Sequence, residues 1–142
     1  MGRPKNTAKR RAEIVEGMLE VMAKRGYDGA SVMAIAKAAG LTSGLVHYHF
    51  GSKREILVAL VEELASRLRR RFDALLDEAG DEPWAALDAF IDAHLALGAD
   101  ADPRAVACWV RVGAEALRDD DVRQVYRRAI EEQLGALDRL LA

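Results

Sequence analysis

Residues 31–53 read SVMAIAKAAGLTSGLVHYHFGSK and carry the strongest structural signal in the chain. Ser31 can cap a short helix that stops at Gly40, and Thr42 can cap a second short helix that ends near Phe50. Gly40 can adopt the positive φ that a tight turn between the two helices requires. Two short helices around such a turn have the spacing of a helix-turn-helix.

The side chains of this motif divide into an inner and an outer set. We expect Ile35, Leu41 and Val46 to point inward, with the small Ala36 where two helices cross closely. A major groove admits a helix whose outer residues have little bulk, and hydroxyl and imidazole groups can bond phosphates or base edges there. The N–H groups at the start of the helix also favour an anion. The outward residues of the second helix are Thr42, Ser43, Gly44, Leu45, His47 and Tyr48.

Charge is divided unevenly along the chain. Residues 1–72 contain 14 Lys and Arg against 7 Asp and Glu, whereas residues 73–142 contain 7 against 16. The basic front can therefore face a polyanion, and the acidic rear cannot. We expect an arm before the first helix that follows the DNA backbone or enters the minor groove. Its basic residues are Arg3, Lys5, Lys9, Arg10 and Arg11.

The composition bounds the class of protein. With 142 residues, 51% of them apolar and 31% charged, the chain can bury the core of one ordinary domain and stay in solution. A single cysteine, Cys108, excludes an internal disulfide framework and a zinc site built on several thiolates. No apolar run approaches a membrane span, and the first residues lack the apolar core of a signal peptide. We therefore expect a soluble cytoplasmic protein.

Apolar residues recur at three- and four-residue steps almost throughout, which predicts an all-α protein. The first helix is expected to end at Gly26, after two terminal cations. Ser52, with Glu55 as the partner of a capping box, starts a long fourth helix. The apolar ridge of that helix, from Ile56 to Leu76, could pack against helices before and after it.

Three further helices are expected behind breaks at residues 80–83 and 100–103 and the acidic run 119–121. The apolar positions of the sixth are Val106, Trp109, Val110 and Gly113, and those of the seventh include Val122, Ala129, Leu134 and Leu141. We predict a three-helix DNA-binding domain over residues 1–51, joined by the long fourth helix to a C-terminal helical domain over 52–142 for ligand binding and dimerisation. Because the apolar pattern still runs at the last residue, we expect a longer natural chain or a partner that completes the last helix.

The motif around the turn resembles the DNA-binding domain of TetR-type transcriptional regulators over roughly residues 8–60. The matching positions are Gly26-Tyr27, Ser31-Val32, Ile35-Ala36, residues 39–44 and residues 48–53. This resemblance implies an all-helical homodimer, with three N-terminal helices on operator DNA and a C-terminal domain that binds a small-molecule inducer. Residues 109–126 are also similar to the C-terminal domains of some choline-responsive regulators of the BetI type.

Carried onto matching positions, the resemblance makes residues 42–49 the recognition helix and Lys53 a phosphate contact of the fourth helix. The predicted DNA-binding residues are Arg3, Lys5, Ser31, Thr42, Ser43, Gly44, Leu45, His47, Tyr48, His49 and Lys53. In the rear half, Phe90, His94, Trp109 and Tyr126 either line a ligand pocket or belong to an ordinary core. His47 and His49 lie on different faces of a helix, so we expect no metal site, and we expect no cofactor.

These observations favour a ligand-responsive repressor that reads a palindromic operator in double-stranded DNA. An alternative is a DNA-binding module whose rear helices bind a protein partner instead of a small molecule, as the open-ended last helix suggests. A helical enzyme is disfavoured, because the sequence offers no catalytic set at usable spacing.

Overall fold

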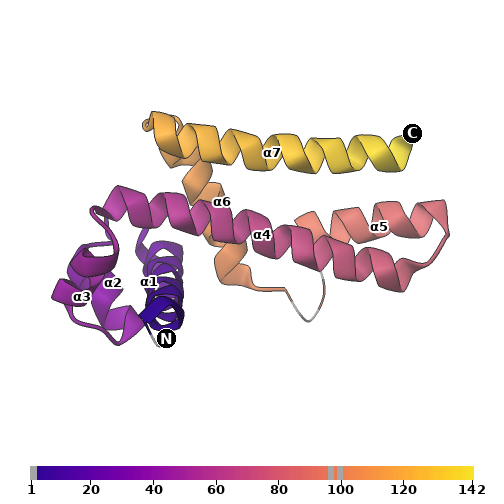
Figure 1. The fold of residues 1–142 in the computed structure, drawn as a ribbon. Coiled ribbons are helices and arrows are strands. Elements are labelled where there is room, and N and C mark those ends of the chain that lie inside the picture. The colour runs from indigo at the N-terminus through magenta and orange to yellow at the C-terminus, as the bar shows by residue number, and fades with distance from the viewer. Residues whose placement is uncertain (1–2, 96–97, 99–100) are drawn as a thin grey trace.

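The computed structural model describes residues 3–95, 98 and 101–142, and within them it contains seven α-helices and no β-strand. The all-α prediction is confirmed. The helices are α1 (Arg3–Arg25), α2 (Val32–Ala39), α3 (Ser43–His49), α4 (Lys53–Ala79), α5 (Pro83–His94), α6 (Pro103–Ala116) and α7 (Asp120–Leu141). Helices α1 to α3 gather at one end of the long α4, and α5 and α7 run beside the rest of α4 (Figure 1).

The short helices begin and end where the sequence predicts. The Ser31 hydroxyl accepts a hydrogen bond from the Ala34 amide, and the Thr42 hydroxyl accepts one from the Leu45 amide. Gly40 has φ of 69°, the left-handed conformation that the turn requires. The motif is therefore a helix-turn-helix set by local capping.

The predicted capping box at the start of α4 has a different second half. The Ser52 hydroxyl accepts from the Glu55 amide at 3.2 Å, as expected. The Glu55 carboxylate, however, accepts from the Gly51 amide at 2.7 Å, one residue before the cap. One bond satisfies a free amide in the first turn of α4 and the other an amide just before the helix, so the start of α4 is fixed directly after the recognition helix.

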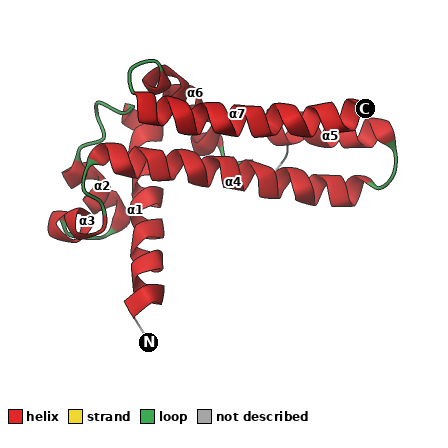
Figure 2. Cartoon of the chain, turned by 45° about the horizontal axis from the view of Figure 1, so that its top comes forward, coloured by secondary structure: helices red, strands yellow, loops and turns green. Residues whose placement is uncertain are grey.

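The prediction of a separate basic arm before the first helix is wrong. Helix α1 already begins at Arg3, and it projects past α2 and α3 toward the N-terminus (Figure 2). Lys and Arg are good helix formers, so this basic segment extends α1. The side chain of Arg3 lies outside the described part of the structure, whereas Lys5 and Lys9 are exposed on the helix.

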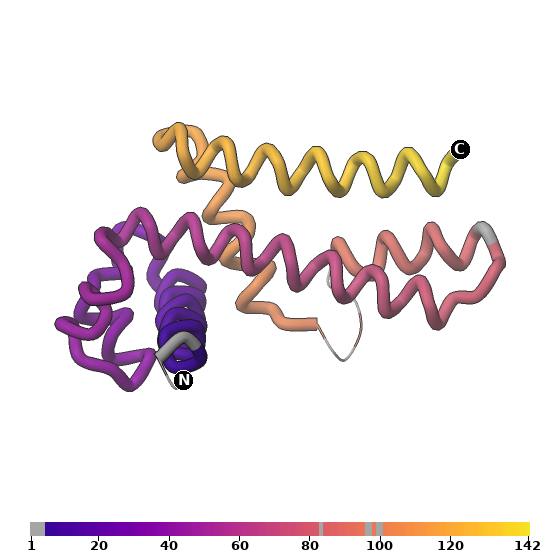
Figure 3. The backbone as a smooth tube through the Cα atoms, viewed as in Figure 1, coloured from indigo at the N-terminus to yellow at the C-terminus, as the bar shows by residue number. Residues whose placement is uncertain are grey.

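Two separate apolar clusters hold the helices together. The larger one joins α1, α2, α3 and the first half of α4 to α6 and the start of α7, and so includes residues on both sides of the predicted boundary at 51/52. The smaller one, toward the other end of α4, has Phe72, Ala89 and Ala93 as its buried members among the described residues. The recognition motif lies at the strongly packed end, and the C-terminus of α7 lies toward the opposite end (Figure 3).

The face of α6 that enters the core agrees only in part with the expected positions, of which Trp109 packs against the larger cluster. Cys108, Val112 and Ala116 are buried, while Val106 and Val110 are exposed. Both faces carry apolar residues at helical spacing, so the pattern alone does not choose between them. In α7, Val122 and Ala129 are buried as expected, but Leu134 and Leu141 are exposed. None of the described helices is long and apolar enough to cross a membrane.

Candidate nucleic-acid interface

The outer face of α3 is small and polar. Thr42, Gly44, His47 and Tyr48 are exposed, whereas Val46 on the opposite side is buried. Ser43 and Leu45, which were predicted to point outward, are half-buried, and so is His49. The structure therefore places four of the predicted recognition residues fully on the surface and three at its edge.

The charge around this face suits a polyanion. No Asp or Glu occurs between residues 29 and 54 of a chain that contains 23 of them. The sequence interpretation missed Lys37 and Met33, which are exposed on α2, the helix before the turn. The absence of acidic residues on both helices was readable in the sequence and would have pointed to Lys37 as a further phosphate contact.

Lys53, predicted to contact phosphate, is tied to the turn after α1. Its ammonium donates to the Tyr27 carbonyl at 2.9 Å and lies 4.0 Å from the centre of the Tyr27 ring. Burial, followed by the charges of Glu115 and Asp119, raises the pKa of Tyr27. The charges of Glu115, on α6, and of Asp119, in the turn after it, therefore act on Tyr27 in the turn before the helix-turn-helix.

The next residue on α4 makes the same connection directly. The Arg54 guanidinium pairs with Asp119 at 3.1 Å and also with Asp121. Asp119 is the N-cap of α7, because its carboxylate accepts from the amides of Asp121 and Val122. One carboxylate thus fixes the start of α7 and contacts the start of α4.

Two of the arginines expected to follow DNA are engaged within the protein. Arg10 pairs with Glu13 on its own helix at 2.8 Å. Arg11 donates to the carbonyl of His49, the last residue of α3, at 2.6 Å. Lys5 and Lys9 are the described residues of the predicted arm that remain as candidates for backbone contacts.

The four residues proposed for a ligand pocket fall into two pairs. Trp109 and Tyr126 lie 4.9 Å apart and pack against the larger core cluster. Phe90 and His94 stack at 3.8 Å, with Phe72 against them, in the smaller cluster. The four candidates therefore do not lie together, because α5 and α6 lie along different parts of α4.

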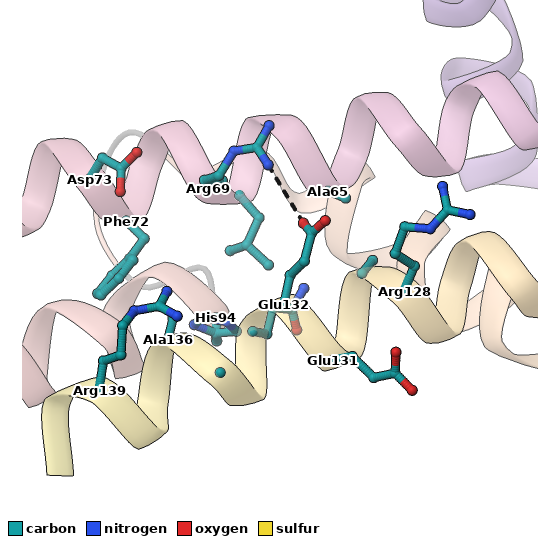
Figure 4. A pocket seen from close by; sticks show the side chains of 14 residues that line it. Ala65, Arg69, Phe72, Asp73, His94, Arg128, Glu131, Glu132, Ala136 and Arg139 are labelled. Atoms are coloured by element: carbon teal, nitrogen blue, oxygen red, sulfur yellow. Dashed lines mark ion pairs between the residues drawn. The ribbon is translucent and has the colours of Figure 1, made fainter. Parts of the chain in front are cut away.

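A cavity of about 540 Å³ lies between α4, α5 and α7, beside the second pair (Figure 4). His94 lines it, while Phe90, Trp109 and Tyr126 do not. The Nδ1 atom of His94 lies 2.7 Å from the Phe90 carbonyl, so in the neutral ring Nδ1 carries the proton and Nε2 is an acceptor. This Nε2 is buried and has no hydrogen-bond partner in the described structure.

The cavity wall combines apolar and charged groups. Leu68, Phe72 and Ala136 supply apolar surface, and Arg69 pairs with Glu132 at 3.5 Å across it. The other charged residues of the wall are Asp73, Arg128, Glu131 and Arg139. Among the described residues there is no group of His, Cys, Asp and Glu that could hold a metal ion.

Comparison with known proteins agrees with this geometry. Residues 14–60 match the family model for bacterial regulatory proteins of the tetR family. The transcriptional regulator BetI of Agrobacterium fabrum is 32% identical over 136 residues, which are 92% of this chain and 65% of the relative. BetI of Rhizobium meliloti is 31% identical over 129 residues, 88% of this chain and 62% of the relative. The chain thus spans slightly less than two thirds of the length of these curated relatives.

Solved structures share the fold over nearly the whole chain. A transcriptional regulator from Rhodococcus has a TM-score of 0.83 and 26% identity, and the match covers 92% of this chain and 68% of that one. A transcriptional regulator from Saccharomonospora viridis, solved in complex with choline, also has a TM-score of 0.83, with 22% identity over 94% of this chain and 68% of that one. The helix-turn-helix and the helices behind it therefore form a known arrangement.

Proposed function

This chain belongs to the TetR family of bacterial regulatory proteins, and from that premise we propose that it is a ligand-responsive repressor of transcription. The observation that carries the proposal is the exposed, non-acidic face of α2 and α3 at one end of the molecule. Two copies would place their recognition helices in successive major grooves of a palindromic operator, about 34–36 Å apart or a multiple of that.

The response to a ligand would pass through α4. This helix begins at Lys53 beside the recognition helix and forms one wall of the cavity farther along. An effector that binds a different position of α4 more tightly would change the separation of the two recognition helices. The proposal therefore requires that the effector bind with different affinity to the DNA-bound position of α4 and to the shifted position.

A set of ion pairs ties α6 to the two helices that support the DNA-binding part. Arg104, in the first turn of α6, contacts Glu16 of α1 at 3.0 Å, and Glu16 also contacts Arg67 of α4 at 2.6 Å. A shift of α6 against α4 would therefore also act on α1.

The chemistry of the cavity supports a small ligand with a hydrogen-bond donor, because His94 belongs to its wall and the buried Nε2 acceptor of that residue has no partner in the described structure. Choline is the first compound to test, since one structural neighbour is described in complex with it. Its hydroxyl could donate to Nε2, and its cation could lie against the Phe72 ring near Asp73 or Glu132.

The test of DNA binding starts with selection of duplexes from a random library at low ionic strength. The solution mass of the protein is then measured alone and with the recovered duplex. We expect recovery of a site with two-fold symmetry and a complex that contains two chains. A folded sample that retains no duplex overturns the proposal.

The alternative function, binding of a protein by the rear helices, is favoured by exposed apolar residues on α5, α6 and α7. Examples are Trp84, Val110 and Leu134. Calorimetric titration of the protein with choline and a metabolite set distinguishes the two functions. Heat of binding that His94→Ala removes supports the small-molecule response, whereas a repeated absence of heat favours the protein partner.

A further inference from the structure

The side chain of Arg11 connects the first helix to the end of the recognition helix. Its Nη1 donates to the His49 carbonyl at 2.6 Å, across 38 positions of sequence. Its Cζ also lies 4.0 Å from the centre of the Phe50 ring. The guanidinium therefore holds both the last residue of α3 and the residue that follows it.

This contact has a physical reason to be strong. The carbonyl of a last helical residue has no partner within its helix, and a cation there is also favoured by the helix dipole. A hydrogen bond from a charged donor is stronger than a neutral one. Phe50 is only 3% exposed, so the ring beneath the guanidinium is itself fixed by the core.

Helix α3 has few other restraints on its direction. It is seven residues long, too short to be stable by itself, and only Val46 within it is buried. At its other end, the Thr42 cap is a local bond that moves with the helix. Among the described contacts that tie α3 to the body of the protein are Val46, Phe50 and, at the exit of the helix, the guanidinium of Arg11.

We propose that Arg11 is a positioning residue, which sets the direction of the recognition helix and so its discrimination between DNA sequences without contacting phosphate. An arginine suits this task because it offers both a planar face for the ring and donors for the carbonyl. The inference rests on the proposed function only where DNA is the readout.

The first test needs no DNA. Amide hydrogen exchange is compared between the wild type and Arg11→Met, which keeps an apolar stem over Phe50 but removes the donors. We expect faster exchange at residues 47–50 and unchanged exchange at Met18 and Leu19 in the core of α1. Unchanged exchange at residues 47–50 would show that Arg11 does not restrain α3 and would overturn the proposal.

The second test uses the selected duplex and a scrambled duplex of the same length and composition. For Arg11→Met we expect affinity for the selected duplex to fall about tenfold, because misdirected base contacts reduce specificity. Affinity for the scrambled duplex and the salt dependence should stay unchanged. Lys9→Ala serves as the contrast: as a phosphate contact it should weaken both duplexes equally and lower the salt slope by about one.

The outcomes separate the two roles of Arg11. An equal loss on both duplexes with a lower salt slope would make Arg11 a phosphate contact and overturn the proposal, as would unchanged affinity throughout. Arg11→Lys, which keeps the charge without the planar fork, should leave affinity for the scrambled duplex unchanged and restore affinity for the selected duplex only in part. A wild type that binds no duplex would instead refute the proposed function, and the exchange experiment would still decide the role of Arg11.

Discussion

Lys53 has a contact within the protein and a proposed contact outside it. One of its three ammonium donors is used by the Tyr27 carbonyl, which leaves two for a phosphate. We expect Lys53→Ala to weaken binding to every duplex and to lower the salt slope by about one. Measurement of affinity against salt concentration checks this, with Lys24→Ala, an exposed cation in the last turn of α1, as the control. An unchanged slope would mean that Lys53 only supports the turn.

Cys108 is fully buried, and burial raises the pKa of its thiol to about 12. The folded chain therefore keeps this proton to higher pH than the unfolded chain, whose thiol has an ordinary pKa of about 8.5. Its contribution to stability is complete below the unfolded pKa and is lost as pH rises toward the folded one.

We predict that the free energy of unfolding of the wild type falls by about 1–2 kcal/mol more than that of Cys108→Ala between pH 8 and pH 10. Urea unfolding of both proteins at the two pH values measures the difference. The comparison with the variant removes the contributions of Lys and Tyr, which titrate in the same range. Parallel behaviour of the two proteins would contradict the assignment of a buried, protonated thiol.

At the level of helices, α1 and α2 cross closely at Gly17. A Cβ atom added there would lie 2.8 Å from the Ile35 carbonyl oxygen and 3.1 Å from the Ala39 Cβ. The sequence indicates a close crossing at Ala36, which is indeed buried, but the position without room for a side chain is on the partner helix. Backbone, rather than a flexible side chain, fills the space.

We expect Gly17→Ala to destabilise the protein by about 1–3 kcal/mol, although alanine is the better helix former. Gly135→Ala in α7 is the matched variant, because its added Cβ would meet only the end of Arg139 at 3.6 Å. That change should stabilise the protein by about 0.5–1 kcal/mol. Chemical denaturation compares the two, and a gain in stability from both would show that α1 and α2 can separate easily.

Over the whole molecule, stability is expected to follow the two clusters. The smaller cluster, with three buried side chains, holds α5 to α4, whereas the larger one holds α1 to the first half of α4. We predict faster amide hydrogen exchange in α5 than in α1, because opening of α5 exposes little apolar surface. A ligand in the cavity should slow exchange in α5 first. Equal protection of both helices would contradict this division.

The helix order and the caps follow from the sequence, because they depend on residues three or four positions apart. Ser31, Thr42 and Ser52 bond amides within their own turns, and Gly40 needs only its own left-handed conformation. Helical periodicity then identifies the long α4 from its apolar ridge. Such signals are local, and no distant contact changes them.

Other features depended on which surfaces meet. The apolar pattern of α6 allows either face to be buried. Cys108 and Val112 are the buried residues, because α1 and α7 pack against that side of the helix. The aromatic candidates separated, since Trp109 and His94 lie along different parts of α4. The sequence alone makes Arg11 one more cation of a DNA-binding segment, and only the tertiary structure shows that it bonds the His49 carbonyl at the end of α3.

The sequence by itself determined where helices start and stop, the helix-turn-helix, and the basic character of its surroundings. Only the tertiary structure decided which apolar face is buried, where the cavity forms and which cations remain available for DNA. The reason is that capping and periodicity act within a few residues, whereas an ion pair, a cavity or a helix crossing requires two distant segments to occupy fixed positions.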